Sequence, residues 1–152
     1  MNWQEVKHLF EWDGSWRDIS ILNADTILWQ KTLDALRRCY SVQYREDGED
    51  KSLPQTVTEM FARRNECSAC LTINAGGLHI NCHFFTVTQI EFDIDPREIK
   101  DEKNFADLRA FMRCIGRKLE RDVILTPEGG EKEMLIAYNP QDDSWQSAIE
   151  RT

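Results

Sequence analysis

Gln89-Ile90-Glu91-Phe92-Asp93-Ile94-Asp95-Pro96 is the stretch that decides the fold, because apolar and acidic residues alternate strictly along it. Successive side chains of an extended strand point to opposite faces, so this segment has an apolar face and an acidic face. Ile90, Phe92 and Ile94 form the first face, and Glu91, Asp93 and Asp95 form the second. Pro96 ends the strand because proline has no amide hydrogen to donate. The sequence therefore predicts a core strand that carries a ladder of three carboxylates.

The carboxylate ladder needs an explanation, since like charges on one face of a sheet destabilise it. A cationic partner or a metal ion would offset the repulsion. Successive carboxylates on a strand lie about 7 Å apart, so two of them would share a Mg²⁺ or Ca²⁺ ion only after reorienting. Arg and Lys side chains on a neighbouring strand would offset the charge equally well on a face exposed to water. These interpretations stay open at this point.

The segments before the ladder indicate an antiparallel ribbon. Cys70–Asn74 and Leu78–Cys82 flank Ala75-Gly76-Gly77, which is typical of a tight turn between strands. A third run, Phe84–Asp95, contains the ladder and continues the meander.

The N-terminal third predicts a hairpin followed by a helix. Val6–Trp12 and Trp16–Leu22 are two β-prone runs separated by Asp13-Gly14-Ser15. Asn23 or Asp25 can cap a following helix, in which apolar residues recur at helical spacing. Those residues are Leu28, Trp29, Leu33, Leu36 and Cys39.

The rest of the chain adds one strand and one helix before the meander, and one helix and two strands after it. Tyr40–Tyr44 is strand-like, Arg45–Ser52 is a charged loop, and a short helix opens at Pro54. A longer amphipathic helix begins after Asn104 as N-cap, and two strands follow at Val123–Thr126 and Met134–Tyr138. Residues 142–152 form either a mobile tail or a short helical one.

This order predicts one α+β domain over residues 1–152. We expect a mostly antiparallel sheet of about six or seven strands with two or three helices packed on one face. The other face would then be free to meet a partner.

The composition of the chain narrows the classes of function that it can have. The chain has 152 residues and a formal net charge of −8, which argues against nucleic-acid binding because phosphate backbones attract clustered Lys and Arg. No apolar run approaches the roughly 20 residues of a membrane span, and the N-terminus lacks a signal-peptide pattern. Five cysteines, an odd number, argue against a disulfide framework. We expect a cytoplasmic protein that uses no cofactor and contacts no membrane.

Cys67, Cys70, His79, Cys82 and His83 form the sharpest metal candidate. Zinc takes four N or S ligands, and a Cys-x-x-Cys pair supplies two of them. Strand geometry opposes the rest, because neighbours such as Cys82 and His83 point to opposite faces. A cysteine nucleophile activated by histidine is a second reading of the same residues. A small metal-dependent or cysteine-using enzyme is therefore an alternative function.

Tryptophan is concentrated near the N-terminus, where Trp3, Trp12 and Trp16 lie within sixteen residues. Aromatic side chains are enriched in the energetic centres of protein interfaces. Depending on the strand register, Trp12 and Trp16 lie in the core or on the surface.

Three segments together resemble a group of small uncharacterised bacterial proteins, some of them similar to immunity proteins of toxin systems. The segments are Phe10–Ile19 (FEWDGSWRDI), His83–Arg97 (HFFTVTQIEFDIDPR) and Leu125–Glu128 (LTPE). The resemblance covers most of the chain but carries no catalytic signature. It implies a single cytosolic α+β domain that binds another protein.

We therefore expect a non-enzymatic binding protein, most concretely an immunity-type inhibitor of a basic toxin such as a nuclease. Acidic side chains would attract the toxin's cationic surface, and aromatic side chains would anchor the contact. The expected contact residues are Glu91, Asp93 and Asp95, a second acidic group of Asp47, Glu49 and Asp50, and Trp12 and Trp16. A regulatory or structural subunit that forms a homodimer is a further alternative.

Overall fold

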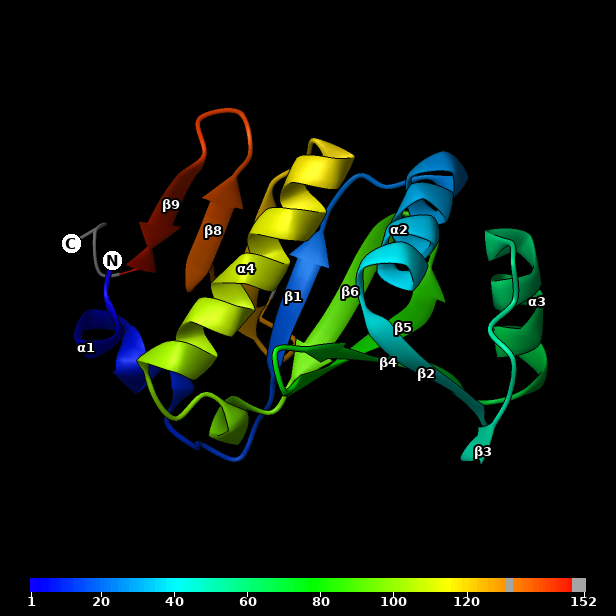
Figure 1. Cartoon of the computed structure of the whole chain (residues 1–152), viewed down its shortest axis with the longest axis horizontal. Coiled ribbons are helices and arrows are strands. Elements are labelled where there is room, and N and C mark those ends of the chain that lie inside the picture. The colour runs from blue at the N-terminus through cyan, green and yellow to red at the C-terminus, as the bar shows by residue number, and fades with distance from the viewer. Residues whose placement is uncertain (131–132, 149–152) are drawn as a thin grey trace.

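Nine antiparallel strands form one sheet in this computed structural model, which describes residues 1–130 and 133–148 (Figure 1). Their order across the sheet is β3-β2-β4-β5-β6-β1-β7-β8-β9. The strands are β1 Arg17–Ile21, β2 Ser41–Glu46, β3 Glu49–Asp50, β4 Ala69–Ala75, β5 Leu78–Thr86, β6 Gln89–Ile94, β7 Val123–Pro127, β8 Ile136–Asn139 and β9 Ser144–Ser147.

Four α-helices accompany the sheet in the described residues: α1 Trp3–Val6, α2 Thr26–Cys39, α3 Val57–Glu66 and α4 Glu102–Leu119. Two short 3-10 helices, η1 Lys7–Phe10 and η2 Pro96–Glu98, complete the list. The helices α2 and α4 lie across the same side of the sheet in Figure 1. The buried side chains of all four α-helices join one hydrophobic cluster with the strands, so the helices share one face.

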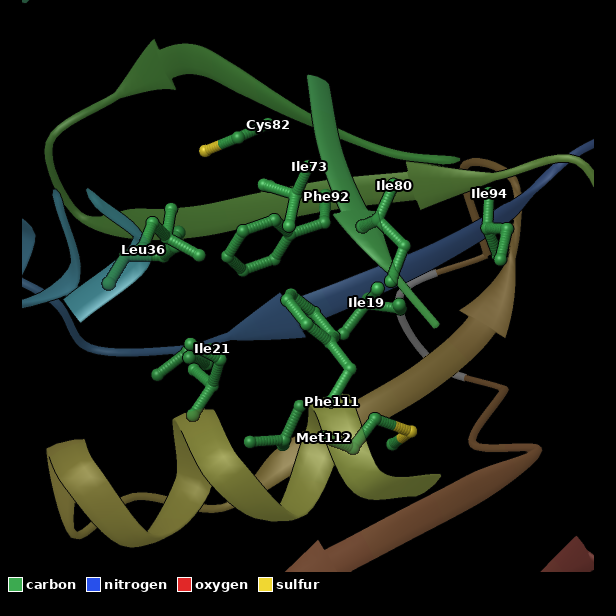
Figure 2. Close-up of a cluster of buried hydrophobic side chains, with 14 of the residues drawn as sticks. Ile19, Ile21, Leu36, Ile73, Ile80, Cys82, Phe92, Ile94, Phe111 and Met112 are labelled. Carbon is green, nitrogen blue, oxygen red and sulfur yellow. The ribbon is translucent and has the colours of Figure 1, made fainter. Parts of the chain in front are cut away.

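The predicted apolar side of β6 lies at the centre of this cluster. Ile90, Phe92 and Ile94 are fully buried, and the ring of Phe92 meets that of Phe111 edge-on at 5.2 Å between centroids. Figure 2 shows Phe92 facing Phe111 of α4, with Ile19 and Ile21 of β1 beside them. The strand prediction is confirmed for β6, and so is the three-stranded meander formed by β4, β5 and β6. The predicted third run, Phe84–Asp95, begins too early, because its first residues belong to β5 and a turn at residues 87–88 precedes β6.

The α+β class and the antiparallel sheet are as expected, but the predicted counts of elements are wrong. The described residues contain nine strands instead of six or seven, and four α-helices instead of two or three. The additional strand β3 has only two residues and pairs Glu49 and Asp50 with the end of β2 inside the expected charged loop. The additional strand β9 lies in the expected tail, where Trp145 pairs with Tyr138 of β8. Residues 149–152 of that tail lie outside the described residues.

The helices α2 and α4 each begin directly after an aspartate whose side chain accepts a hydrogen bond from a backbone amide of the first turn. Asp25 caps α2 by accepting a bond from Leu28 N at 2.8 Å, which decides between the two predicted caps. The expectation that Asn104 caps α4 is wrong. Asp101 is the cap, and Asn104 N donates to its Oδ1 at 2.8 Å.

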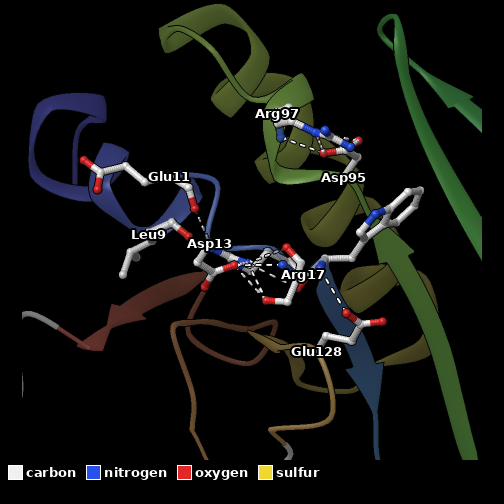
Figure 3. Close-up of polar contacts among 9 residues, drawn as sticks. Leu9, Glu11, Asp13, Arg17, Asp95, Arg97 and Glu128 are labelled. Atoms are coloured by element: carbon white, nitrogen blue, oxygen red, sulfur yellow. Dashed lines mark hydrogen bonds and ion pairs between the residues drawn. The ribbon is translucent and has the colours of Figure 1, made fainter.

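The predicted N-terminal hairpin is also wrong, because residues 3–10 are helical. Asn2 and Glu5 form a reciprocal capping box that starts α1. The buried Arg17 then fixes the following loop by donating to backbone carbonyls of Leu9, Glu11 and Ser15 at 2.9 to 3.0 Å. Figure 3 shows the guanidinium of Arg17 at the centre of these contacts. A carbonyl-lined loop therefore takes the place of a first strand.

Among the described residues, no helix has the length and apolar character that crossing a membrane requires.

Gly116 of α4 should not tolerate alanine, although alanine is normally about 1 kcal/mol better than glycine inside a helix. An added Cβ would lie 2.7 Å from Cδ1 of Tyr138. That ring is fully buried against Trp145, with 4.8 Å between centroids, so it has little room to move. We expect Gly116→Ala to lower the free energy of unfolding by about 1 to 3 kcal/mol in chemical denaturation. A stabilised variant would show that the ring of Tyr138 moves freely.

Candidate functional site

The carboxylates of β6 lie on the sheet face opposite the helices, which we call the open face. Strand alternation places on it the side chains of β6 residues that do not enter the core, together with their cross-strand partners. The open face is defined by Asp18 and Ser20 of β1, Thr72 of β4, Asn81, His83 and Phe85 of β5, and Glu91 and Asp93 of β6. Two rungs of the predicted ladder, Glu91 and Asp93, are therefore on a face that no helix of the described residues covers.

Asp93 is the centre of a hydrogen-bonded row that crosses three strands. Thr72 Oγ1 donates to Asn81 Oδ1 at 2.9 Å, and Asn81 Nδ2 donates to Asp93 Oδ1 at 3.1 Å. The other carboxylate oxygen of Asp93 lies 2.7 Å from His83 Nε2. Both oxygens are thus held by fixed partners, so the orientation of this carboxylate is set before any ligand arrives.

Asp18 faces Asp93 directly across the β1–β6 pair. Its Oδ2 accepts a hydrogen bond from Gly129 N at 3.0 Å, and no ion pair to it is formed by the described residues. Burial raises the pKa of Asp18, and the nearby charges of Asp93 and Glu128 raise it further. Asp18 and Asp93 are two like charges directly opposite each other on paired strands, and a bound cation would relieve their repulsion.

His83 is the basic side chain that contacts Asp93. It lies opposite Glu91 in the β5–β6 register, and its ring stacks on that of Phe85 at 4.9 Å between centroids. Burial lowers the pKa of His83, but the hydrogen bond to Asp93 and the charges of Asp93, Glu91 and Asp18 outweigh it and raise the pKa above 6.5. Phe85 is 54% exposed, which is unusual for a phenyl ring.

Asp95 departs from the predicted ladder. Its carboxylate accepts hydrogen bonds from Arg97 N and Arg97 Nε at 2.9 and 3.0 Å. The bond from the backbone N caps the start of η2. The hydrogen bond from the Arg97 side chain lowers the pKa of Asp95. The third carboxylate is therefore occupied by an internal partner, as Figure 3 shows.

The two candidate tryptophans lie near this end of β6. The guanidinium of Arg97 lies 3.8 Å from the ring centre of Trp12, which is 48% exposed. Trp16 is partly buried, and its backbone pairs with Glu128 just beyond the β1–β7 ladder. Trp12 is thus a surface residue.

The second predicted acidic group does not join the first. Asp47, Glu49 and Asp50 lie at the β2–β3 end of the sheet, and four strand spacings of roughly 4.8 Å separate β3 from β6. Asp47 accepts a bond from Ser68 N at 2.9 Å, and Asp50 accepts from Gln43 and Arg45. A partner would need to span roughly 19 Å of sheet to contact both groups.

The five Cys and His residues of the enzyme alternative do not converge. Cys82 is fully buried in the core, whereas His83 lies on the open face. Cys67 follows the end of α3, and His79 pairs with Glu98 at 3.0 Å. In residues 1–130 and 133–148, no three His, Cys, Asp or Glu side chains are arranged to hold a metal ion.

The thiols also lack the electrostatics of a nucleophile. Burial raises the pKa of Cys67, Cys70 and Cys82, and nearby acids raise it further. A reactive cysteine requires the opposite shift, since the thiolate is the nucleophile.

Sequence reasoning missed Asp18, Asn81 and Phe85 as members of the site. The alternation of Arg17-Asp18-Ile19-Ser20-Ile21 contains a signal for Asp18, because Ile19 and Ile21 mark the core side. The pairing of β1 with β6 has no comparable signal, so the contact between Asp18 and Asp93 becomes visible only in the fold.

Comparison with models of protein families, with curated proteins and with solved structures finds no match to this chain.

Proposed function

We propose that this chain is a non-enzymatic binding protein whose open face docks onto a basic protein, as an immunity-type inhibitor docks onto a basic toxin such as a nuclease. One observation carries the proposal: Asp18, Glu91 and Asp93 lie together on a sheet face that no helix of the described residues covers, beside the exposed ring of Phe85. Carboxylates next to an aromatic anchor are a common composition of interfaces with cationic partners.

The net charge of the whole chain also supports binding to a basic partner. A formal net charge of −8 attracts a basic partner over distances longer than a direct contact. The buried Arg17 adds no positive charge to the open face, because its side chain points to the opposite side of β1 and is only 4% exposed. Among the residues that define the open face, His83 is the basic side chain; Arg45 of β2 lies beyond them and forms an ion pair with Asp50.

The fixed geometry of Asp93 supports binding without rearrangement. Asn81 and His83 hold its two oxygens, so docking costs little side-chain entropy at this position. A guanidinium or ammonium group from the partner would complete the coordination of a carboxylate that is already oriented.

The test is affinity capture from the native cell on the immobilised chain, followed by measurement of Kd with the purified captured protein. The open-face variant combines Asp18→Asn, Glu91→Gln and Asp93→Asn, which remove charge and preserve shape. We expect one basic protein to bind the wild type, with affinity that falls with salt, and the variant to bind about 100-fold more weakly or worse.

A matched control removes charge elsewhere on the surface. Glu59→Gln, Glu102→Gln and Asp142→Asn together change three exposed carboxylates on α3, on α4 and in the β8–β9 turn, and we expect wild-type affinity. Equal binding by the open-face variant and the wild type would refute the proposal. Self-association of the chain through the open face, lost in the same variant, would favour the homodimer instead.

A further inference from the structure

We propose that His83 regulates the open face in response to pH: in its neutral form it leaves the carboxylates to a cationic partner, and in its protonated form it competes with that partner. This inference rests on the proposed function and concerns the control of the same face.

The geometry makes His83 the internal competitor for Asp93. The 2.7 Å contact between His83 Nε2 and Asp93 Oδ2 occupies the oxygen that Asn81 leaves available. Both side chains are about a fifth exposed, 22% for His83 and 23% for Asp93, so a partner can reach the pair from solvent. The stacked ring of Phe85 restricts the imidazole to this orientation, with 7° between the two ring planes.

The groups around His83 are mostly acidic. On β6, Asp93 and Glu91 face the imidazole, and on β1 Asp18 adds a third carboxylate. On β4, Cys70 comes directly before Leu71, which pairs with Cys82 of β5. Burial raises the pKa of the Cys70 thiol, so the thiol stays neutral.

Two arginines lie on elements in the same region of the described chain, α3 and β2. On α3, the guanidinium of Arg64 lies 6.0 Å from the ring centre of Phe85, the ring that stacks on His83. On β2, Arg45 is the register partner of Cys70 and forms its ion pair with Asp50. These surroundings favour the protonated imidazole and explain why the pKa of His83 is raised.

Binding of a cation should reverse this preference. A guanidinium placed between Asp18 and Asp93 repels a protonated His83 and takes its hydrogen-bond acceptor, so docking lowers the pKa of His83 and releases a proton. By linkage, binding must then tighten as the pH rises through the pKa of His83. The arginine side chains of the partner keep their charge throughout this range.

The experiment measures two quantities on the full chain. First, NMR follows the imidazole of His83 in the free protein, where we expect a pKa above the ordinary value of about 6.5 and a lower one in Asp93→Asn. Second, calorimetry measures the affinity for a synthetic octa-arginine peptide at low salt. We expect about tenfold tighter binding at pH of about 8.5 than at about 6, as a one-unit pKa change on binding produces.

Two variants isolate the residue. His83→Gln should bind the peptide with equal affinity at both pH values, whereas His79→Gln, a control on the same strand that contacts Glu98, should keep the wild-type pH dependence. The same pH dependence in His83→Gln as in the wild type, or a free-protein pKa at or below about 6.5, would refute the regulation and leave the docking face intact. If neither the wild type nor His83→Gln bound the peptide saturably at either pH, the docking face would be refuted, and the regulation with it.

Discussion

Replacement of Arg17 by methionine is expected to lower the free energy of unfolding by about 3 to 5 kcal/mol, because several backbone carbonyls lose their donor at a cost of about 1 to 3 kcal/mol for each one that stays buried. The side chain is 4% exposed and donates to four backbone carbonyls, those of Leu9, Glu11, Ser15 and Trp16. Methionine fills much of the same volume but donates nothing, so several carbonyls lose their partner. The loss should be measured by urea denaturation monitored by far-UV circular dichroism.

Two further variants separate geometry from charge at this position. Arg17→Lys keeps the charge but lacks the planar fork, so it should recover only a small part of the lost stability. Asp13→Ala removes the ion-pair partner at 3.2 Å, but that carboxylate is exposed, so stability should change little. A Met variant as stable as the wild type would mean that the loop of residues 9–16 does not depend on Arg17.

Replacement of Phe92 by alanine is the second large effect, with an expected loss of about 3 to 5 kcal/mol. The ring is fully buried between the sheet and α4, where Phe111 packs against it edge-on. Removing it leaves a cavity at the strand that holds Asp93, and β-sheet neighbours on both sides limit its collapse. Thermal and urea unfolding should both report the loss.

Phe92→Leu provides the graded control, since it keeps most of the apolar volume and should cost clearly less than the alanine variant. Equal losses for leucine and alanine would indicate that the aromatic contact with Phe111, instead of buried volume, dominates at this position.

Local patterns in the sequence were sufficient for the parts of the fold that depend on local chemistry. The alternation around Phe92 predicted β6, and the Gly76-Gly77 turn predicted the β4–β5 hairpin. The start of α2 was narrowed to two candidate caps, Asn23 and Asp25, of which Asp25 is the cap. The N-terminal hairpin failed because β-prone residues there are overruled by distant contacts. Trp3 and Phe10 pack on Phe105 of α4, and no local sequence pattern predicts that contact.

The candidate site was predictable to a similar degree. Glu91 and Asp93 follow from alternation alone, but their neighbours depend on which strands pair with β6. Asp95 failed because the proline after it begins a 3-10 helix, and the carboxylate then caps that helix. His83 was considered as a metal ligand or as the base of a cysteine nucleophile, whereas the structure makes it the partner of Asp93.

The central position of β1 has a consequence for how the chain acquires its sheet during synthesis. This strand leaves the ribosome early, yet its neighbours are residues 90–94 on one side and residues 124–127 on the other. Until these segments emerge, β1 has two unpaired edges, the state in which strands are most prone to pair with other chains. The two halves of the sheet meet only at this strand, so the open face, whose acids come from both β1 and β6, is completed late in folding.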